Sequence, residues 1–319
     1  MNIKNVAVLG TGTMGHGIAL LSAKAGLNVK MYGRTDESLD RGISSIIASL
    51  NRLTIQGNLS EFECQEILGR IKGVKTLEEV AEDTDFIIES VAENLELKQN
   101  IFNKLDSLCG PEVILASNTS GLSPTDIAKT TTYPERVVIA HFWNPPQLIP
   151  LVEVVPGEKT SEETVDITVE WVNFIGKKAV KMEKECLGFI GNRLQLALLR
   201  EAMYIVEKGW AKPEEVDKAM EYGHGRRLSV TGSLCSADLG GLDIFNNISS
   251  YLFEDLCNYT DPSKLLENKV KENKLGTKSG EGFYKWDKEK IENKQNERTE
   301  VLLYFLDRDS NENKACENK

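Results

Sequence analysis

His141 and Glu153 are the residues of this sequence best placed for acid–base chemistry. His141 follows the apolar run 137–140, and Glu153 lies in a second apolar run, 151–155, after a proline-rich turn. A neutral imidazole whose second nitrogen is held by a buried carboxylate is the usual form of a general base. We predict that His141 accepts a proton and that Glu153 orients its ring. A structural histidine at a strand end and a glutamate on an exposed edge strand are the alternatives.

Ser120 belongs to a hydroxyl-rich segment that follows another apolar run. Residues 116–121 read Ala-Ser-Asn-Thr-Ser-Gly and continue directly from the run 113–116. In open α/β sheets, ligands bind outside the carboxyl ends of the strands, so Ser120 is placed to contact a ligand near His141. From the residues alone, a helix cap ahead of Pro124 is the more ordinary role for Ser120.

The N-terminal segment carries a phosphate-binding pattern. The apolar run 6–9 ends in the fingerprint Gly10-Thr-Gly12-Thr13-Met14-Gly15, and apolar residues at helical spacing follow. The first glycine permits a tight turn, the second lets a pyrophosphate approach the backbone, and the third allows close helix–strand packing. A helix that begins near Thr13 would direct its free N–H groups at the phosphates. The pattern predicts a dinucleotide site, with a plain glycine-rich turn as the alternative.

The end of the second expected strand bears on the choice of cofactor. NAD enzymes usually place an acid there to bind the ribose 2′-hydroxyl, whereas an arginine accepts the 2′-phosphate of NADP. Here the strand 28–32 is followed by Gly33-Arg34-Thr35, with no carboxylate at its end. The expected cofactor is NAD(P), with NADP indicated at least as strongly as NAD. A solvated turn is the alternative role for Arg34.

Alternating strands and helices predict an α/β fold, a Rossmann-type doubly wound parallel sheet over residues 1–185. The expected strands are 3–9, 28–32, 85–89, 113–116, 137–140, 151–155 and 179–182. The expected helices are 13–26, two within 37–72, 95–108 and one around 160–175. Gly57-Asn58 separates the two helices of 37–72, and Ser60 is the expected N-cap of the second.

Residues 186–319 predict an all-α C-terminal domain. A long helix is expected at 192–207, and Pro213 suits the first turn of the next helix. The segment 238–256 carries more apolar residues than a small helical domain needs for its own core, so we expect a homodimer through this domain. The tail after about 309 is polar and is expected to be disordered.

Composition excludes several function classes. A net charge of −11 and a pI near 5.0 argue against nucleic acid or an anionic membrane as a partner. The six cysteines are scattered without a C-x-x-C pair, which predicts reduced thiols and no metal site. No apolar run approaches the roughly 20 residues of a membrane span, and the first residues show no signal-peptide pattern. We expect a cytoplasmic enzyme that acts on a small molecule.

Six motifs, taken in order, resemble the L-3-hydroxyacyl-CoA dehydrogenases, especially the bacterial 3-hydroxybutyryl-CoA type. They are Gly10-x-Gly12-x-Met14-Gly15, Ala116-Ser-Asn-Thr-Ser120, His141-Phe-x-Asn144-Pro, Leu151-Val-Glu-Val, Gly188-Phe-Ile-x-Asn192-Arg193-Leu and Lys278-Ser-Gly-x-Gly-Phe-Tyr284. The match runs unbroken from residue 3 to about 286. Six motifs in one register are a specific signal.

The resemblance implies an oxidoreductase of fatty acid metabolism whose dinucleotide and dimerising helical domains hold an acyl-CoA substrate between them. It implies that His141 takes the hydroxyl proton while hydride passes to NAD(P), and that Glu153 stabilises the imidazolium. Ser120 and Asn192 would hydrogen-bond the substrate oxygen and support its developing charge. The positions that contact the cofactor in the family correspond to Glu93, Lys98, Ser120, Asn144 and Lys278.

The sequence departs from the family pattern at three places. The acid at the end of the second strand is replaced by Gly33-Arg34, which bears on NAD use. The arm that usually carries lysines for the CoA phosphates reads Leu53-Thr-Ile-Gln-Gly57, with Arg52 as the neighbouring cation, and this weakens the case for CoA. A Pro-x-Gly-Pro turn is replaced by Gly223-His-Gly-Arg226-Arg227. The two arginines suit a carboxylate substrate, or else belong to a solvated turn.

Three functions therefore compete. The leading interpretation is a 3-hydroxyacyl-CoA dehydrogenase of the 3-hydroxybutyryl-CoA type. The alternative is an NAD(P)-dependent dehydrogenase of the same family that acts on a CoA-free hydroxy acid or alcohol. The third is a structural protein on this scaffold, of the kind found among lens crystallins. Intact Ser120, His141, Glu153 and Asn192 argue against the third, because a structural protein has no chemical need for all four.

Overall fold

The computed structural model describes residues 3–55 and 59–317, with side chains up to residue 309. Gln56 and the predicted turn Gly57-Asn58 lie outside the described residues. The chain divides into two compact units, one of Met1–Ile190 with Thr299–Lys319 and one of Gly191–Arg298. The predicted domain boundary at 185/186 lies near the division between Ile190 and Gly191. The boundary itself stays a prediction.

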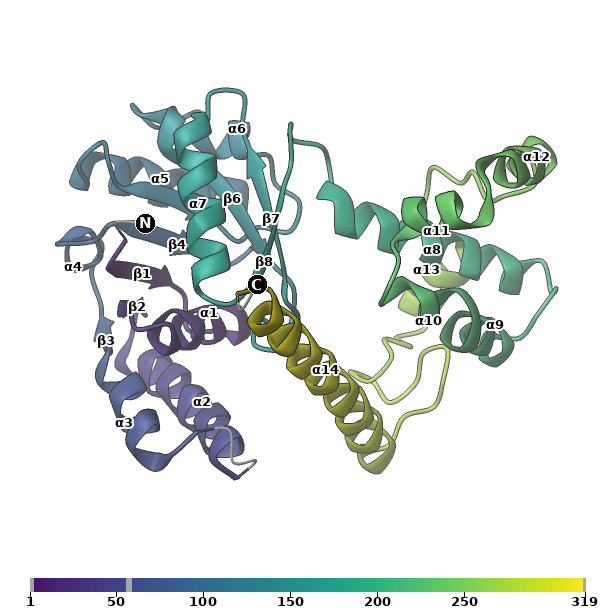
Figure 1. Cartoon of the computed structure of the whole chain (residues 1–319), viewed down its shortest axis with the longest axis horizontal. Helices are drawn as coiled ribbons and strands as arrows, with labels where there is room; N and C mark the ends of the chain where they lie inside the picture. The colour runs from purple at the N-terminus through teal and green to yellow at the C-terminus, as the bar shows by residue number, and fades with distance from the viewer. Residues whose placement is uncertain (1–2, 56–58, 318–319) are drawn as a thin grey trace. The chain divides into compact units, whose positions relative to one another are not determined.

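One eight-stranded sheet is the centre of the first unit (Figure 1). The strand order is β3-β2-β1-β4-β5-β6-β7-β8. The strands are β1 (Asn5–Leu9), β2 (Asn28–Tyr32), β3 (Ile71–Val74), β4 (Phe86–Glu89), β5 (Ile114–Ser117), β6 (Val137–Phe142), β7 (Leu151–Pro156) and β8 (Lys178–Lys181). The predicted Rossmann-type α/β architecture is confirmed.

Helices cover both faces of the sheet because its strands are apolar on both sides. One core holds Val6 and Val8 of β1, and the other holds Ala7 and Leu9, as the two-residue period of a strand requires. The first core is completed by α1 (Thr13–Lys24), α2 (Asp36–Ile55), α3 (Glu61–Gly69) and α7 (Glu162–Phe174). The second is completed by α4 (Leu77–Ala81), α5 (Leu95–Leu108) and α6 (Pro124–Ala128).

The last two strands run antiparallel to the first six, so the predicted parallel sheet is mostly rather than wholly parallel. β6 pairs with β7 antiparallel, and β7 pairs with β8 parallel. Only residues 143–150 join β6 to β7. A parallel crossover needs about a dozen residues or more, whereas an antiparallel return needs very few. The beginning of β7 therefore lies beside the carboxyl end of β6, where the candidate histidine is.

The second expected helix within 37–72 ends earlier than expected, and a short strand follows it. α3 ends at Gly69, and residues 71–74 form the edge strand β3 beside β2. The sequence Ile-Lys-Gly-Val is too short and too polar for strand periodicity to reveal it. Ser60 is confirmed as the N-cap of α3, where its side chain and that of Glu63 form a capping box.

The second unit is helical, as predicted. Its elements are α8 (Phe189–Glu207, of which the first two residues belong to the first unit), α9 (Pro213–Ala219), a π-helical turn (Met220–His224), α10 (Gly225–Leu228), α11 (Ser233–Gly240), α12 (Leu242–Leu252), α13 (Lys264–Lys271) and the first part of α14 (Lys288–Glu317). Pro213 opens α9, which confirms that prediction. α14 continues to Glu317, whereas the sequence predicts a disordered tail after about 309.

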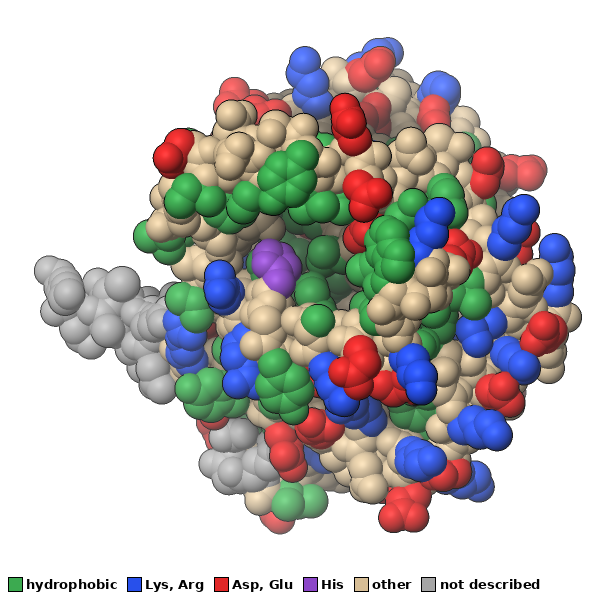
Figure 2. All heavy atoms as spheres, turned by 90° about the vertical axis from the view of Figure 1, so that its right-hand side faces the viewer, with side chains coloured by type: hydrophobic (Ala, Val, Ile, Leu, Met, Phe, Trp, Pro, Cys, Tyr) green, Lys and Arg blue, Asp and Glu red, His purple; other side chains and the backbone are tan. Residues whose placement is uncertain are grey.

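The apolar side chains of 238–256 lie at the surface. Leu239, Leu242 and Phe253 are 76%, 61% and 71% exposed. Figure 2 shows hydrophobic side chains interspersed with charged ones on the face that it views. This exposure agrees with the expected contact surface, and the homodimer itself stays a prediction. Within the described part of the chain, no helix is both long enough and apolar enough to cross a membrane.

Candidate active site

Four parallel strands end side by side at the carboxyl edge of the sheet. Their register aligns Leu9 of β1 with Glu89 of β4, and Glu89 with Ser117 of β5. Ser117 in turn pairs with Ile139 of β6, two residues before His141. The loops that follow these strands share one edge, which is where ligands bind in such folds.

His141 and Glu153 face each other across the antiparallel pair of β6 and β7. The Nδ1 atom of His141 lies 2.9 Å from Oε2 of Glu153. The two residues are 6% and 0% exposed. A carboxylate only accepts hydrogen bonds, so Nδ1 carries the hydrogen and Nε2 is left as the basic nitrogen. The structure brings the predicted pair together in a general-base arrangement.

Further donors hold the carboxylate of Glu153. The backbone N–H of Ile190 donates to Oε1 at 2.8 Å, and the indole N–H of Trp143 donates to Oε2 at 3.2 Å. Donors on both oxygens compensate the burial of a negative charge. They also fix the plane of the carboxylate, and this plane sets the direction of its hydrogen bond to Nδ1 of His141.

The ring of Phe189 packs against the imidazole of His141. The ring centroids are 5.6 Å apart with the planes tilted by 55°, and Phe189 is 1% exposed. Sequence reasoning missed Trp143, Phe189 and Ile190 as neighbours of the candidate pair. All three lie within the motifs quoted above, but no periodicity or spacing indicates that residues 189 and 190 return to β6 and β7.

The glycine turn after β1 has the shape that a pyrophosphate requires. A Cβ atom at Gly10, whose φ is +113°, would lie 2.6 Å from the backbone oxygen of Ser90. A Cβ at Gly15 would lie 2.0 Å from the backbone oxygen of Gly10. At Gly12, the N-cap of α1, a Cβ would meet nothing within 4 Å. The first and third glycines are thus needed for packing, and the second leaves open space at a helix N-terminus, which fits a phosphate.

The next residues of α1 complete this turn. Thr13 and Met14 occupy its first turn, and α1 has no acidic residue there. His16 follows, and burial lowers the pKa of its imidazole. His16 is therefore neutral near pH 7, so the turn offers an anion the N–H groups and dipole of the helix rather than a side-chain charge.

The end of β2 has no room for the family's acid. Gly33 donates its N–H to Val74, and a Cβ on Gly33 would lie 2.7 Å from Oγ of Ser38 and 2.9 Å from Cγ of Leu39. The next residue, Arg34, is exposed. Any discrimination between cofactors at this position therefore falls to Arg34 and the first turn of α2.

That first turn carries two acids. Asp36 pairs with Lys75 at 3.1 Å. Hydrogen bonds to the carboxylate of Glu37, from its own backbone N–H and then from Thr35, lower the pKa of Glu37. Lys75 therefore partly neutralises the charge of Asp36, whereas Glu37 is held in its charged form at the N-terminus of α2.

Lys98 is placed differently from the expected cofactor contact. Its ammonium is 1% exposed and lies 2.8 Å and 2.9 Å from the two carboxylate oxygens of Glu89, a residue with no exposed surface. It also lies 3.4 Å from Oε2 of Glu93, which is 45% exposed. The other oxygen of Glu93 accepts the backbone N–H of Ser120 at 3.1 Å. Lys98 thus joins a buried carboxylate to an exposed one that holds Ser120, and its cofactor role stays a prediction.

The remaining predicted residues lie in three places. Ser120 is exposed and does not cap α6, because Ser123 is the N-cap of that helix. This removes the more ordinary role considered for Ser120. Asn144 is exposed just after β6. Asn192 in α8 and Lys278 between α13 and α14 belong to the second unit, and their roles stay predictions.

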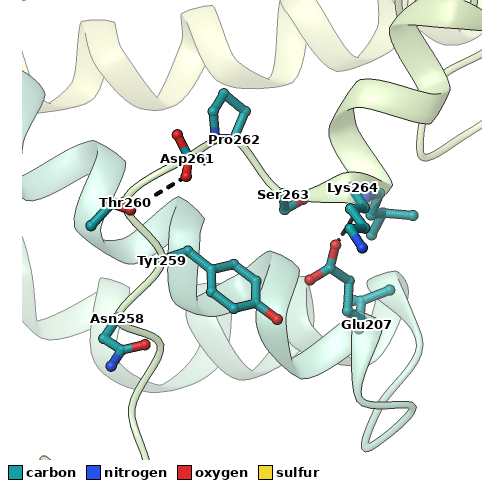
Figure 3. A pocket seen from close by; sticks show the side chains of 10 residues that line it. Glu207, Asn258, Tyr259, Thr260, Asp261, Pro262, Ser263 and Lys264 are labelled. Atoms are coloured by element: carbon teal, nitrogen blue, oxygen red, sulfur yellow. Dashed lines mark hydrogen bonds between the residues drawn. The ribbon is translucent and has the colours of Figure 1, made fainter.

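A cavity of about 950 Å³ in the second unit is lined by none of these residues. It lies between α8 and the segment 258–265, and Figure 3 shows the ring of Tyr259 extending toward Glu207 there. No group of three or more His, Cys, Asp or Glu side chains among the described residues is arranged to hold a metal ion.

The family models cover nearly all of this architecture. Residues 5–186 match the NAD binding domain of 3-hydroxyacyl-CoA dehydrogenase, and residues 188–286 match its C-terminal domain. The chain belongs to the 3-hydroxyacyl-CoA dehydrogenase family. It is an oxidoreductase with an NAD-binding domain, and the resemblance read from the six motifs is confirmed.

Two relatives show the range of chemistry close to this 3-hydroxyacyl-CoA dehydrogenase family member. It is 41% identical over 288 residues to a probable 3-hydroxybutyryl-CoA dehydrogenase of Bacillus subtilis, covering 90% of this chain and 99% of that protein. It is 35% identical over 301 residues to the 5-formyl-3-hydroxy-2-methylpyridine 4-carboxylate 5-dehydrogenase of Mesorhizobium japonicum, covering 94% and 96%.

Solved structures of the family show the same range. A crystal structure of a 5-formyl-3-hydroxy-2-methylpyridine 4-carboxylic acid 5-dehydrogenase, described as an NAD⁺-dependent dismutase, superposes with a TM-score of 0.87 at 35% identity, covering 95% of this chain and 97% of that one. The (S)-3-hydroxybutyryl-CoA dehydrogenase of Ralstonia eutropha superposes with a TM-score of 0.77 at 34% identity, covering 90% and 100%. Family membership is thus compatible with substrates that carry CoA and with one that does not.

Proposed function

We propose that this enzyme interconverts an L-3-hydroxyacyl-CoA of the 3-hydroxybutyryl type and its 3-oxoacyl-CoA, using NAD(P). The observation that carries the proposal is the buried pair of His141 and Glu153 at the carboxyl edge of the sheet, joined at 2.9 Å. A buried, oriented imidazole with a free Nε2 is suited to removing a proton from an alcohol. Four relatives named as 3-hydroxybutyryl-CoA dehydrogenases or probable ones support this substrate class.

In this mechanism the Nε2 atom of His141 takes the proton of the substrate hydroxyl. A nicotinamide cofactor, when bound, would supply the acceptor for the hydride that leaves the substrate carbon as the proton passes to His141. Glu153 stabilises the imidazolium that forms and keeps its hydrogen on Nδ1. Ser120 and Asn192 donate hydrogen bonds to the substrate oxygen as its charge changes. A positioned base contributes roughly 10²–10⁴ to the rate, so His141 is the residue on which turnover depends most.

For the cofactor, we propose that NADP is accepted at least as well as NAD. Gly33 leaves no side chain to bind the ribose 2′-hydroxyl, and exposed Arg34 provides a guanidinium at the end of β2. Asp36 is partly neutralised by Lys75, so it repels a 2′-phosphate less than a free acid would. Glu37 remains charged and opposes the phosphate.

A second candidate is a CoA-free substrate that carries a carboxylate. Arg226 and Arg227 are both exposed in α10, directly after the π-helical turn that ends at His224. The guanidinium of Arg226 lies 5.0 Å from the ring centroid of Tyr222, which holds it in place. Arginine binds a carboxylate through two parallel hydrogen bonds. The similarity to an enzyme named for a pyridine carboxylate supports this candidate.

The third interpretation, a structural protein, gains no support. A buried polar pair such as Glu153 and His141 gives little net stability compared with apolar packing. A protein under selection for stability alone has no use for it.

Steady-state kinetics distinguish these functions. We expect reduction of acetoacetyl-CoA with NADH or NADPH, and no rate with either cofactor would contradict the leading proposal. Oxidation of 5-formyl-3-hydroxy-2-methylpyridine 4-carboxylate without a rate on acetoacetyl-CoA would select the second candidate. In that case the double variant Arg226→Ala, Arg227→Ala should raise KM for the carboxylate at least about tenfold, the loss of one charged hydrogen bond. The matched variant Arg298→Ala, in α14, should not change KM.

We also propose a homodimer formed through the second unit, in the cytoplasm. Exposed apolar side chains of α11 and α12, such as Leu239 and Leu242, support the dimer. Sedimentation at micromolar concentration tests it, with Leu239→Asp expected to favour the monomer. The scattered cysteines are compatible with a reducing compartment.

A further inference from the structure

The segment Gly188-Phe189-Ile190, which begins α8, has an unusual backbone. Gly188 has φ of +78° and Phe189 has φ of +51°. Positive φ is ordinary for glycine and rare for a bulky aromatic residue. Such a conformation persists only where the surrounding structure over-determines it, and these outliers cluster at functional sites.

Two consecutive residues of this segment contact both members of the catalytic pair. The Phe189 ring packs against His141 with centroids 5.6 Å apart, and the N–H of Ile190 donates to Oε1 of Glu153 at 2.8 Å. The N–H of Phe189 bonds to the carbonyl of Cys186 at 3.1 Å, which closes the turn. Because φ at Phe189 sets the direction of its ring and of the next amide together, one backbone conformation determines both contacts.

The chemistry requires both contacts to be accurate. Nε2 of His141 must lie within hydrogen-bond reach of the substrate hydroxyl, and an error of about 1 Å can cost 10²-fold in rate. Glu153 restrains the imidazole only through Nδ1, at one point on the edge of the ring. A ring packed on the imidazole restrains rotation about that point, which the carboxylate cannot do.

We propose that Phe189 is a positioning residue for the catalytic base: its left-handed backbone places its ring against His141 and the following amide against Glu153. The proposal rests on the proposed role of His141.

The test compares Phe189→Leu with Phe86→Leu. Both phenylalanines are buried, 1% and 0% exposed, but Phe86 is the first residue of the central strand β4, at the end of that strand away from the candidate site. Both variants create similar cavities and should lower the thermal midpoint similarly. We expect Phe189→Leu to lower kcat about tenfold or more with KM for substrate and affinity for NADH unchanged, and Phe86→Leu to leave kcat unchanged.

A second measurement does not depend on turnover. The chain has three histidines, so ¹⁵N-histidine spectra are simple, and a His141→Asn variant assigns the signals of His141. In the unmodified protein we expect one set of His141 ring signals with a slowly exchanging Nδ1–H. Phe189→Leu should give faster exchange or more than one set, and Phe86→Leu should not. Phe189→Met replaces Phe189→Leu if the latter does not fold.

The outcomes separate this proposal from the proposed function. Equal kcat in both leucine variants, or identical His141 spectra, would overturn the positioning role. An unmodified protein that turns over no substrate would contradict the proposed function alone, and the spectra would still decide whether Phe189 orients His141. A rise in KM or a fall in cofactor affinity without a change in kcat would also overturn the proposal, because it would indicate a binding role.

Discussion

Replacing Glu153 by glutamine should convert the candidate base into the wrong tautomer without removing its side chain. The donors to the carboxylate include Nδ1–H of His141, the indole of Trp143 and the N–H of Ile190. Glutamine has the same shape but one oxygen and one NH₂ group. If its oxygen faces Ile190, the NH₂ faces His141 and Trp143. His141 then accepts at Nδ1 and carries its hydrogen on Nε2, where the base is needed.

The size of the effect follows from this exchange. In a comparable carboxylate–imidazole pair, the amide substitution lowers kcat by about 10⁴ through the wrong tautomer. We expect a loss of about 10³–10⁴, which corresponds to roughly 4–5.5 kcal/mol of barrier. Either orientation leaves a buried donor unpaired, the indole N–H of Trp143 in the first and the N–H of Ile190 in the opposite one, at about 1–3 kcal/mol of stability. The protein should still fold in either case.

The assay is the rate of NADH oxidation with acetoacetyl-CoA, together with thermal unfolding and NADH binding. Glu158→Gln is the matched control, because Glu158 is exposed in the loop after β7. We expect NADH affinity to be unchanged in both variants. The reasoning is refuted if Glu153→Gln keeps kcat within about tenfold of the unmodified enzyme while it folds normally. It is also refuted if the effects of Glu153→Gln and His141→Ala on kcat multiply, since residues that act as a unit are not additive.

Four further substitutions address the cofactor turn and the core. Arg34→Ala should raise KM for NADPH about tenfold or more and leave KM for NADH unchanged, and equal effects on both would show that Arg34 does not meet the 2′-phosphate. Gly12→Ala should weaken NADH binding, measured by fluorescence titration, without loss of stability. Gly15→Ala should unfold the domain, because its Cβ would lie 2.0 Å from the backbone oxygen of Gly10, and calorimetry measures this loss. Burial lowers the pKa of Lys177 to about 8, so the unfolded chain binds more protons than the folded one between pH 8 and 10.5. Near pH 7 the buried lysine is charged, so Lys177→Met should raise the unfolding free energy by about 1–3 kcal/mol. Urea titrations should show this gain becoming smaller toward pH 10.5. A gain that stays constant with pH would contradict a charged, buried lysine.

Much of the fold was predictable because its signals are local. The glycine turn between β1 and α1 requires residue types that few other structures require, and Ser60 and Pro213 mark helix starts by their own chemistry. The edge strand β3 gives no such signal, since residues 71–74 are few and partly polar. The reversed direction of β7 depends on the length of the connection 143–150, which a pattern of strands and helices alone does not weigh.

The site was predictable in part for the same reason. His141 and Glu153 stand near strand ends, and their register makes them neighbours once β7 is antiparallel. The burial of Lys98 against Glu89 depends on the packing of α5 on the sheet, which spacing does not encode. The contact of Phe189 with His141 depends on a positive φ at a residue that rarely adopts one, so nothing in the sequence points to it.

The most direct test of the central claim is a comparison of kcat and NADH affinity in His141→Ala. If the buried imidazole is the base, kcat should fall by about 10²–10⁴ while the NADH dissociation constant stays within about twofold of that of the unmodified enzyme. A variant that keeps kcat within about tenfold, or that loses NADH binding together with turnover, would contradict the assignment of His141 as the base.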